Sequence, residues 1–237
     1  EDVAMVNGLR QGINNQVQSN DQVYRTMRLA LSCTGEYGTY HGGAAGALAA
    51  MNATMTRCNG VFQRDLAVKL IIIANNSSVI YTNANTDPYS PSSAMNNWNA
   101  ELQANLTAVI GEANYDIGHL FGATGGGGSA GCIGCVCVNG QKGSGITSPA
   151  DGVPMGDTFD IDYVAHEMGH QMGANHTFTH TAENNAVNVE PGSGSTIMAY
   201  AGIGGGGTDM QNNSDDYFTY RSILQIQTNL KIGRAHV

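Results

Sequence analysis

Residues 166–176 read His166-Glu167-Met168-Gly169-His170-Gln171-Met172-Gly173-Ala174-Asn175-His176, and this stretch decides how the rest of the chain has to be arranged. Residues four apart on an α-helix lie one turn above each other on the same face. His166 and His170 can therefore direct two imidazoles at one metal ion. Glu167 lies one position further round the helix, where its carboxylate is close to the ion and free for acid–base work.

His176 can join the other two histidines only if the helix stops. Six residues at about 100° each would carry its side chain roughly 240° round the axis and about 9 Å further along. Gly173 is placed for the break, because glycine enters a left-handed turn without steric cost. Three neutral imidazoles and one open position are typical of a catalytic zinc site, since structural zinc sites normally have a fourth protein ligand. The alternative is a helix with surface histidines, which leaves the remaining features of the stretch as coincidences.

The pattern H-E-x-x-H-x-x-G-x-x-H resembles that of the metzincin metallopeptidases. About twenty residues downstream stands a segment similar to the Met-turn of that clan, Gly194-Ser195-Thr196-Ile197-Met198-Ala199-Tyr200-Ala201-Gly202. The resemblance implies one catalytic Zn²⁺ held by His166, His170 and His176. It also implies that Met198 forms an apolar floor beneath the imidazoles.

The resemblance implies peptide hydrolysis, with zinc activating a water and Glu167 acting as general base and then as proton donor to the leaving amine. Tyr200 stands two residues after Met198, a spacing at which astacin- and serralysin-like enzymes use a tyrosine at the zinc or the reaction intermediate. A packed surface tyrosine is the alternative. His180 would close the zinc site as a fourth ligand, so we expect it at the surface.

The likeness extends over roughly residues 24–230 and is greatest to bacterial reprolysin-like (adamalysin-related) enzymes. Reprolysins usually carry Asp after the third His, whereas this chain has Thr177. The tyrosine after the Met-turn is more typical of serralysins or astacins, so the branch within the clan stays open. The implied fold is α+β: a twisted, mostly parallel sheet with an antiparallel edge strand, packed helices and a small C-terminal subdomain after the zinc motif.

The composition of the chain limits the classes of partner that the protein can bind. The chain has 237 residues, a net charge of −9 and only ten Lys and Arg, with no basic run. Nucleic acid and anionic membrane surfaces are therefore poor partners. No apolar run of about 18 residues is present, so no membrane span is predicted. We expect a monomer whose protein or peptide substrate binds along an edge strand. Calcium is left open as a second cofactor, although no loop has the carboxylate spacing to support it.

Hydrophobic periodicity predicts the elements of the domain. The expected strands are 24–33 (half-buried), 66–73 (central and covered on both faces), 79–82, 116–121 and 130–138, the last being the antiparallel edge implied by the resemblance. The expected helices are 42–58, 92–111 capped by Ser92 or Ser93, 161–172 capped by Asp160 or Asp162, and a final helix capped within 214–216. Residues 125–128 read as a flexible loop, and His119 as a packed histidine.

We expect a peptidase domain over residues 23–230, with an upper part at 23–175 and a lower part at 176–230. Residues 1–22 read as a propeptide remnant or linker. Residues 231–237 fit neither helix nor strand and resemble a translated sequencing adapter, so we expect an artefactual tail.

The cysteines and one N-glycosylation sequon give information on disulfides and on where the protein is located. Cys132, Cys135 and Cys137 have metal-like spacing but lack an evident further ligand, so disulfides or buried thiols are favoured over a second zinc. The sequence Asn175-His176-Thr177 would place an N-linked glycan beside a zinc ligand. This favours a host that does not glycosylate, hence a secreted bacterial protein.

The function predicted from the sequence is a secreted zinc endopeptidase. A catalytically inactive metzincin that serves as a protein-binding module is the main alternative, against which the retained Glu167 argues. A zinc hydrolase of non-peptide bonds is the third, and the expected edge strand disfavours it.

Overall fold

The computed structural model describes residues 23–183 and 185–230. The predictions for residues 1–22 and 231–237 therefore concern segments outside the described residues. In chain order the elements are β1 (Arg25–Cys33), α2 (Gly35–Tyr40), α3 (Ala44–Val61), η1 (Phe62–Leu66), β2 (Val68–Ile72), η2 (Asn76–Val79), η3 (Ser92–Asn97), α4 (Trp98–Val109), η4 (Glu112–Asn114), β3 (Ile117–Phe121), β4 (Gly127–Ser129), β5 (Gly145–Ser148), η5 (Thr158–Ala165), α5 (His166–Met172) and α6 (Tyr220–Leu230).

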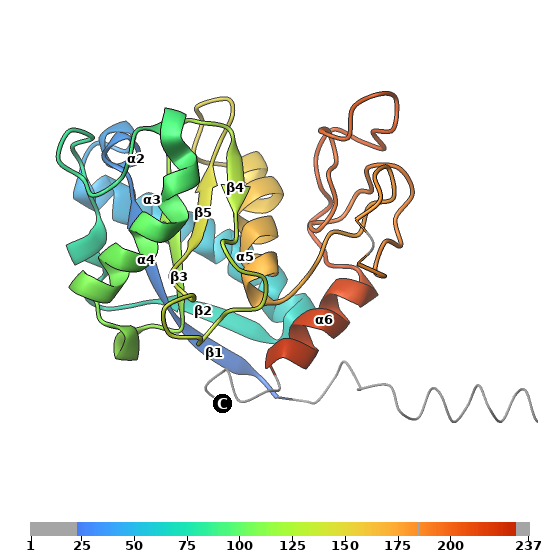
Figure 1. The fold of residues 1–237 in the computed structure, drawn as a ribbon, viewed down its shortest axis with the longest axis horizontal. Helices are drawn as coiled ribbons and strands as arrows, with labels where there is room; N and C mark the ends of the chain where they lie inside the picture. Colours follow the sequence, from blue (N-terminus) through green and yellow to red (C-terminus); the bar gives the residue numbers. More distant parts are fainter. Residues whose placement is uncertain (1–22, 184, 231–237) are drawn as a thin grey trace, which may run out of the picture.

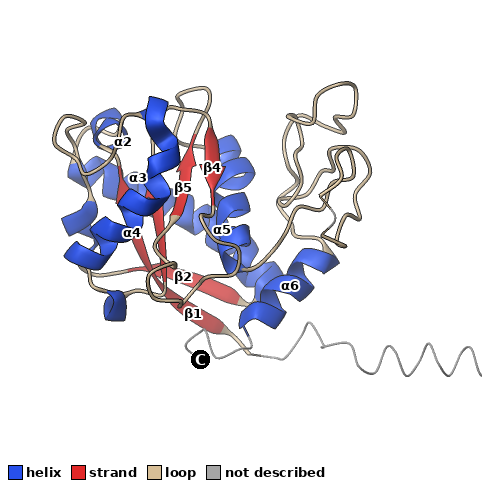
Figure 2. Ribbon diagram, viewed as in Figure 1, coloured by secondary structure: helices blue, strands red, loops and turns tan. Residues whose placement is uncertain are grey.

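The fold is a mixed α+β structure built on one five-stranded sheet with the order β2-β1-β3-β5-β4. Four strands are parallel, and β4 pairs antiparallel with β5 at one edge. Helices lie on both sides of the strands (Figure 2). The predicted mostly parallel sheet with an antiparallel edge strand is confirmed.

Two apolar clusters cover the two faces of the sheet. One joins Leu29 and Leu31 of β1 to α3 and to the helix that carries the zinc motif. The other joins Ala30 to Trp98, Leu102 and Leu106 of α4. Both faces of β1 are thus buried, and the prediction that this strand is half-buried was wrong, because α4 covers the face on which Ala30 and Ser32 lie.

Three strand predictions were wrong in position. The segment 66–73 was expected at the centre of the sheet, but β2 is an edge strand whose Ile71 is 47% exposed. The segment 130–138 was expected to be the edge strand. That edge is instead β4, which overlaps the glycine-rich stretch expected to be a loop, and 130–138 forms turns. Residues 79–82 form only an isolated bridge at Ile80, and β5 was not predicted.

The predicted helix caps were also wrong. Neither η3 nor η5 has a side-chain cap bond at its start. Asp162 accepts hydrogen bonds from the lower loop, where the Ser214 backbone N–H lies 2.8 Å from its Oδ1. The hydroxyl of Thr219 accepts from the backbone N–H of Ser222 at 3.2 Å and so serves the start of α6. Asp162 is thus engaged by a neighbour distant in sequence, which a local cap pattern does not show, and the cap of α6 lies three residues after the predicted segment.

Two asparagine side chains complete the sheet where strand pairing ends. The amide of Asn76 donates to the carbonyl of buried Leu31 and accepts from its N–H, both at 2.8 Å, beyond the point where β2 stops. Asn59 makes the same pair of bonds, also at 2.8 Å, to Leu70 in the middle of β2. Each amide thus satisfies one backbone donor and one backbone acceptor.

In Figure 1 the loops between α5 and α6 stand to one side of the sheet, with α5 between. None of the helices in the described part of the chain has the length and apolar character needed to cross a bilayer.

Asn76→Ala should lower the free energy of unfolding by about 2–3 kcal/mol, because it leaves two buried backbone groups of Leu31 without partners. Urea denaturation followed by circular dichroism measures the change. Asn75→Ala is the matched control, because Asn75 is exposed and makes no side-chain cap bond, and it should stay within about 0.5 kcal/mol of the parent. Equal stability of the two variants would contradict the role of Asn76.

Candidate metal site

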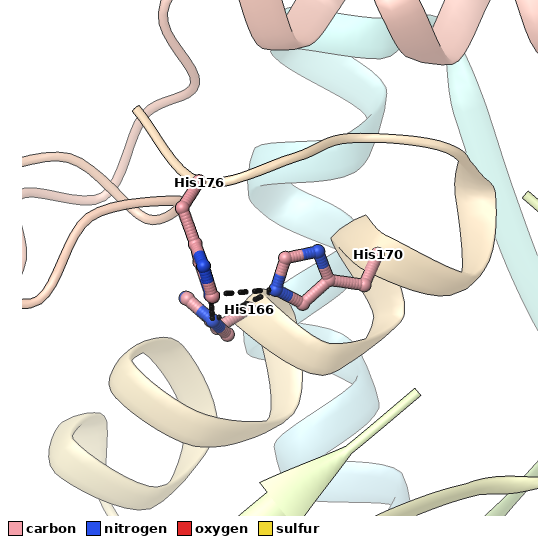
Figure 3. A group of neighbouring side chains, drawn as sticks. All are labelled: His166, His170 and His176. Atoms are coloured by element: carbon pink, nitrogen blue, oxygen red, sulfur yellow. Dashed lines mark hydrogen bonds between the residues drawn. The ribbon is translucent and has the colours of Figure 1, made fainter. Parts of the chain in front are cut away.

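The first part of the zinc motif, from His166 to Met172, lies on one continuous helical segment that begins earlier than predicted. Eight residues of η5, in π geometry, run directly into the seven-residue α5, which starts at His166. The helix ends at Gly173, whose φ of 123° belongs to the left-handed half of backbone space. The expected break at Gly173 is therefore present, and the chain turns back so that His176 faces the helix (Figure 3).

The structure brings the three predicted histidines together. The Nε2 atoms of His166 and His170 are 3.1 Å apart, and those of His170 and His176 are 3.0 Å apart. The third pair, His166 to His176, is separated by 3.2 Å (Figure 3). Among the described residues these three form the one cluster of His, Cys, Asp or Glu side chains compact enough to hold a metal ion.

The hydrogen bond at Nδ1 of each ring determines which of its two nitrogens carries the proton. Nδ1 of His166 lies 2.6 Å from the carbonyl oxygen of Ile197, and Nδ1 of His170 lies 2.7 Å from that of Ala174. Nδ1 of His176 lies 2.9 Å from a carboxylate oxygen of Glu183. Because these oxygens only accept, each Nδ1 carries the proton and each neutral ring presents a bare lone pair at Nε2.

The surroundings of His166 and His170 favour the neutral form of these two imidazoles. Burial, reinforced by the neighbouring His176, lowers the pKa of His170 to about 4. Burial is also the main cause that lowers the pKa of His166, and the other two histidines add to it. Neutral imidazole is the form that binds metal.

These donors fit a zinc ion. Two nitrogens bound to one tetrahedral zinc at about 2.0–2.1 Å are about 3.3 Å apart, close to the separations found here. Three lone pairs that converge without a shared proton repel one another, and a cation between them removes that repulsion. The residues that would hold zinc are thus His166, His170 and His176.

Glu167 is buried beside this cluster, beneath the edge strand. A Cβ built on Gly128 of β4 would lie 2.3 Å from its Oε1 and 2.5 Å from its Cγ, so any larger residue there would force the Glu167 side chain out of this position. Burial raises the pKa of Glu167 to about 8, and a hydrogen bond from the backbone of Ala130 opposes the rise. A divalent cation at the imidazoles favours the carboxylate and opposes it further.

Met198 packs against the zinc helix, and the ring of Tyr200 lies beside two of the histidine rings. Met198 is fully buried, and a Cβ on Gly169 of the zinc helix would come within 2.5 Å of its sulfur. The ring centroid of Tyr200 is 4.6 Å from that of His176 and 5.7 Å from that of His166. Burial raises the pKa of Tyr200 to about 12, with Glu167 and Glu183 contributing.

His180 is half-buried rather than at the surface, with its ring 4.4 Å from that of Phe178, and it does not belong to the three-histidine cluster. His119 is packed, as predicted. Its ring nitrogens contact Gln171 at 2.7 Å and Thr147 at 2.8 Å, which ties the zinc helix to the sheet. Burial lowers the pKa of His119 to about 4.

Two carboxylates escaped the sequence analysis because nothing in the local pattern marks them. Glu183 accepts from His176, as described above. Glu190 is buried and accepts from the backbone N–H of Ser195 at 2.9 Å and from the hydroxyl of Thr196 at 2.6 Å, and it also binds the hydroxyl of Thr177. It therefore joins the residue after the third histidine to the segment that precedes Met198.

The cysteines were predicted to form disulfides or buried thiols, and the structure contains both. Cys132 and Cys135 are bonded to each other, whereas Cys33 and Cys58 are buried thiols. The turn that the disulfide closes touches the zinc helix, since the N–H of Gly134 donates to the carbonyl of His170 at 2.9 Å.

Glu183→Ala should weaken zinc binding about 10–100-fold, because His176 loses the acceptor that orients its ring. Competition with a chelator of known affinity measures the change. Glu183→Gln keeps an acceptor oxygen and should recover part of the loss, which separates orientation from charge. Zinc affinity unchanged within about twofold in Glu183→Ala would exclude the role.

The sequence of the whole domain was compared with known proteins and protein families. A search of curated proteins finds no match. The family model described as "Metallo-peptidase family M12B Reprolysin-like" matches residues 23–230, which includes the sheet, the zinc helix and the loops up to α6. The chain therefore belongs to the reprolysin-like metallopeptidases of family M12B.

Proposed function

We propose that this zinc metallopeptidase is an endopeptidase in which Glu167 serves as the general base. The observation that carries the proposal is the position of one carboxylate between three convergent imidazoles and an edge strand. Glu167 lies next in sequence to His166 and directly beneath Gly128 of β4. A peptide paired with β4 would pass over both groups.

Zinc bound to the three imidazoles would act as a Lewis acid that polarises the scissile carbonyl and acidifies water. The Glu167 carboxylate then accepts the proton of the attacking water and delivers it to the nitrogen of the departing amine. Its burial suits the first of these two steps, because a carboxylate whose pKa is raised is a stronger base than an exposed one. Tyr200 would donate its phenolic hydrogen bond to the oxygen that becomes negatively charged.

The edge strand supports a peptide substrate. Since β4 borders β5 alone, its other side has no partner strand among the described residues. An extended peptide can add there by backbone hydrogen bonds, which every peptide sequence can form. Two cavities flank this path, of about 330 Å³ and about 290 Å³, and both are lined by Gly128, Glu167 and Tyr200.

Secretion from a bacterial host and a monomeric state are also part of the proposal. The glycan argument at Asn175 supports secretion from a bacterial host, and the low number of Lys and Arg argues against nucleic acid and anionic membranes as partners. Calcium has no support in the carboxylate arrangement. Burial of Glu167 beside the histidines disfavours the alternative of an inactive binding module, which would not require that carboxylate.

Glu167→Ala should retain one equivalent of zinc but lose peptide hydrolysis by at least about 10²–10⁴-fold, because the general base is gone. His170→Ala should lose both zinc and hydrolysis. Casein cleavage, with and without a chelator, is measured beside zinc content. Wild-type protein that holds zinc but does not cleave would favour the binding module, and an unaffected rate in Glu167→Ala would remove the base from the mechanism.

Tyr200→Phe removes only the hydroxyl and keeps the ring that packs against His176 and Phe178. If the hydroxyl stabilises the reaction intermediate, kcat should fall at least about tenfold with KM little changed. Steady-state kinetics on one peptide decides this. A kcat within about twofold of the parent would leave Tyr200 as a packing residue.

A further inference from the structure

One of the two cavities beside the metal site has a distinct chemical character. It measures about 290 Å³ and lies between the helix before His166 and the segment that follows Met198. Tyr163 and Ile203 supply apolar surface, whereas Thr158, Asp162 and Asn213 supply polar groups. Ile203 is 69% exposed and stands free to cover a bound side chain.

The acidic and basic side chains that line this cavity give it a negative character. Asp162 and Glu167 are the acidic side chains among the described residues that line it, and no Lys or Arg is among them. Glu167 is committed to the reacting bond in the proposed mechanism. Asp162 is one helical turn before His166 and thus supplies a second carboxylate away from that bond.

Asp162 is held in place and still has room for a partner. Its Oδ2 accepts from the side-chain amide of Asn213 and its Oδ1 accepts from the backbone N–H of Ser214, both at 2.8 Å. An ionised carboxylate offers about four acceptor positions, so two are left. Within residues 23–183 and 185–230 it forms no ion pair with Lys, Arg or His.

The direction of β4 assigns the cavity to one side of the scissile bond. The cavity with Asp162 meets β4 at Gly127 and Gly128, whereas the other cavity meets the chain at Gly128 through Ile133. A peptide antiparallel to β4 runs the opposite way, so it passes the other cavity first. Antiparallel pairing is the slightly more stable arrangement. The Asp162 cavity then receives the residue directly C-terminal to the cleaved bond.

We propose that Asp162 is a specificity-determining residue that selects Arg or Lys immediately C-terminal to the scissile bond. This inference rests on the proposed endopeptidase function. The methylene stem of the basic side chain would lie against Tyr163 and Ile203, and its head group would donate to Asp162. An acidic side chain would be repelled, and an apolar one would cover the Asp162 carboxylate without supplying a partner.

The test uses two peptides that differ only in Arg or citrulline at the position C-terminal to the cleaved bond. Citrulline keeps the shape of the side chain and removes its charge. Zinc-loaded wild-type protein should show a kcat/KM at least about tenfold higher for the Arg peptide at low salt, with the cleavage position read by mass spectrometry. High salt should reduce the ratio.

Asp162→Asn should bring the two peptides within about twofold of each other, while cleavage of the citrulline peptide is retained. Asp151→Asn is the charge-matched control, because Asp151 is exposed and lines neither cavity, and it should leave the ratio unchanged. In wild-type protein, equal cleavage of the two peptides would overturn the inference.

An equal loss on both peptides in Asp162→Asn would show a merely structural role and also overturn it, while leaving the endopeptidase function intact. Absence of cleavage of every peptide by zinc-loaded wild type would remove both proposals together.

Discussion

The structure depends on three imidazole lone pairs that converge on one point. Each Nδ1 is tied to an oxygen that can only accept, so none of the rings can relieve the approach of the others by sharing a proton. Two of these oxygens are backbone carbonyls, supplied by Ile197 and Ala174. The Met-turn and the turn after Gly173 are therefore structural requirements of the metal site as well as parts of the fold.

The carboxylate of Glu190 holds together the loops between α5 and α6. Glu190 bonds the backbone and hydroxyl of Thr196 and the hydroxyl of Thr177, and Thr177 is the residue that departs from the usual reprolysin pattern. A hydroxyl next to His176 thus meets a carboxylate that comes from another loop. Because Glu190 also fixes the residues that lead to Ile197, it connects the orientation of His176 with that of His166.

The sequence was sufficient for the family and for the mostly parallel sheet of a mixed α+β fold, but not for the edges of the sheet. The grouping of His166, His170 and His176 follows from local spacing and one glycine, both of which are visible in the sequence. The edge strand β4 was missed because Gly127 and Gly128 carry no hydrophobic signal, and the glycine at 128 is explained only by its contact with Glu167, which lies 39 residues away in sequence. The apolar run of β2 suggested a central strand, although strand order depends on crossovers that periodicity does not encode. Glu183 and Glu190 gain their roles from tertiary folding alone.

The Asn59 amide at the far edge of the sheet has a consequence for how the protein behaves in concentrated solution. It holds the N–H and C=O of Leu70 in the middle of β2, where another chain would otherwise add a strand. Aggregation through this edge is thereby discouraged despite the exposed Ile71. The opposite edge of the sheet is β4, which lies beside the metal site and has no partner strand on its outer side among the described residues.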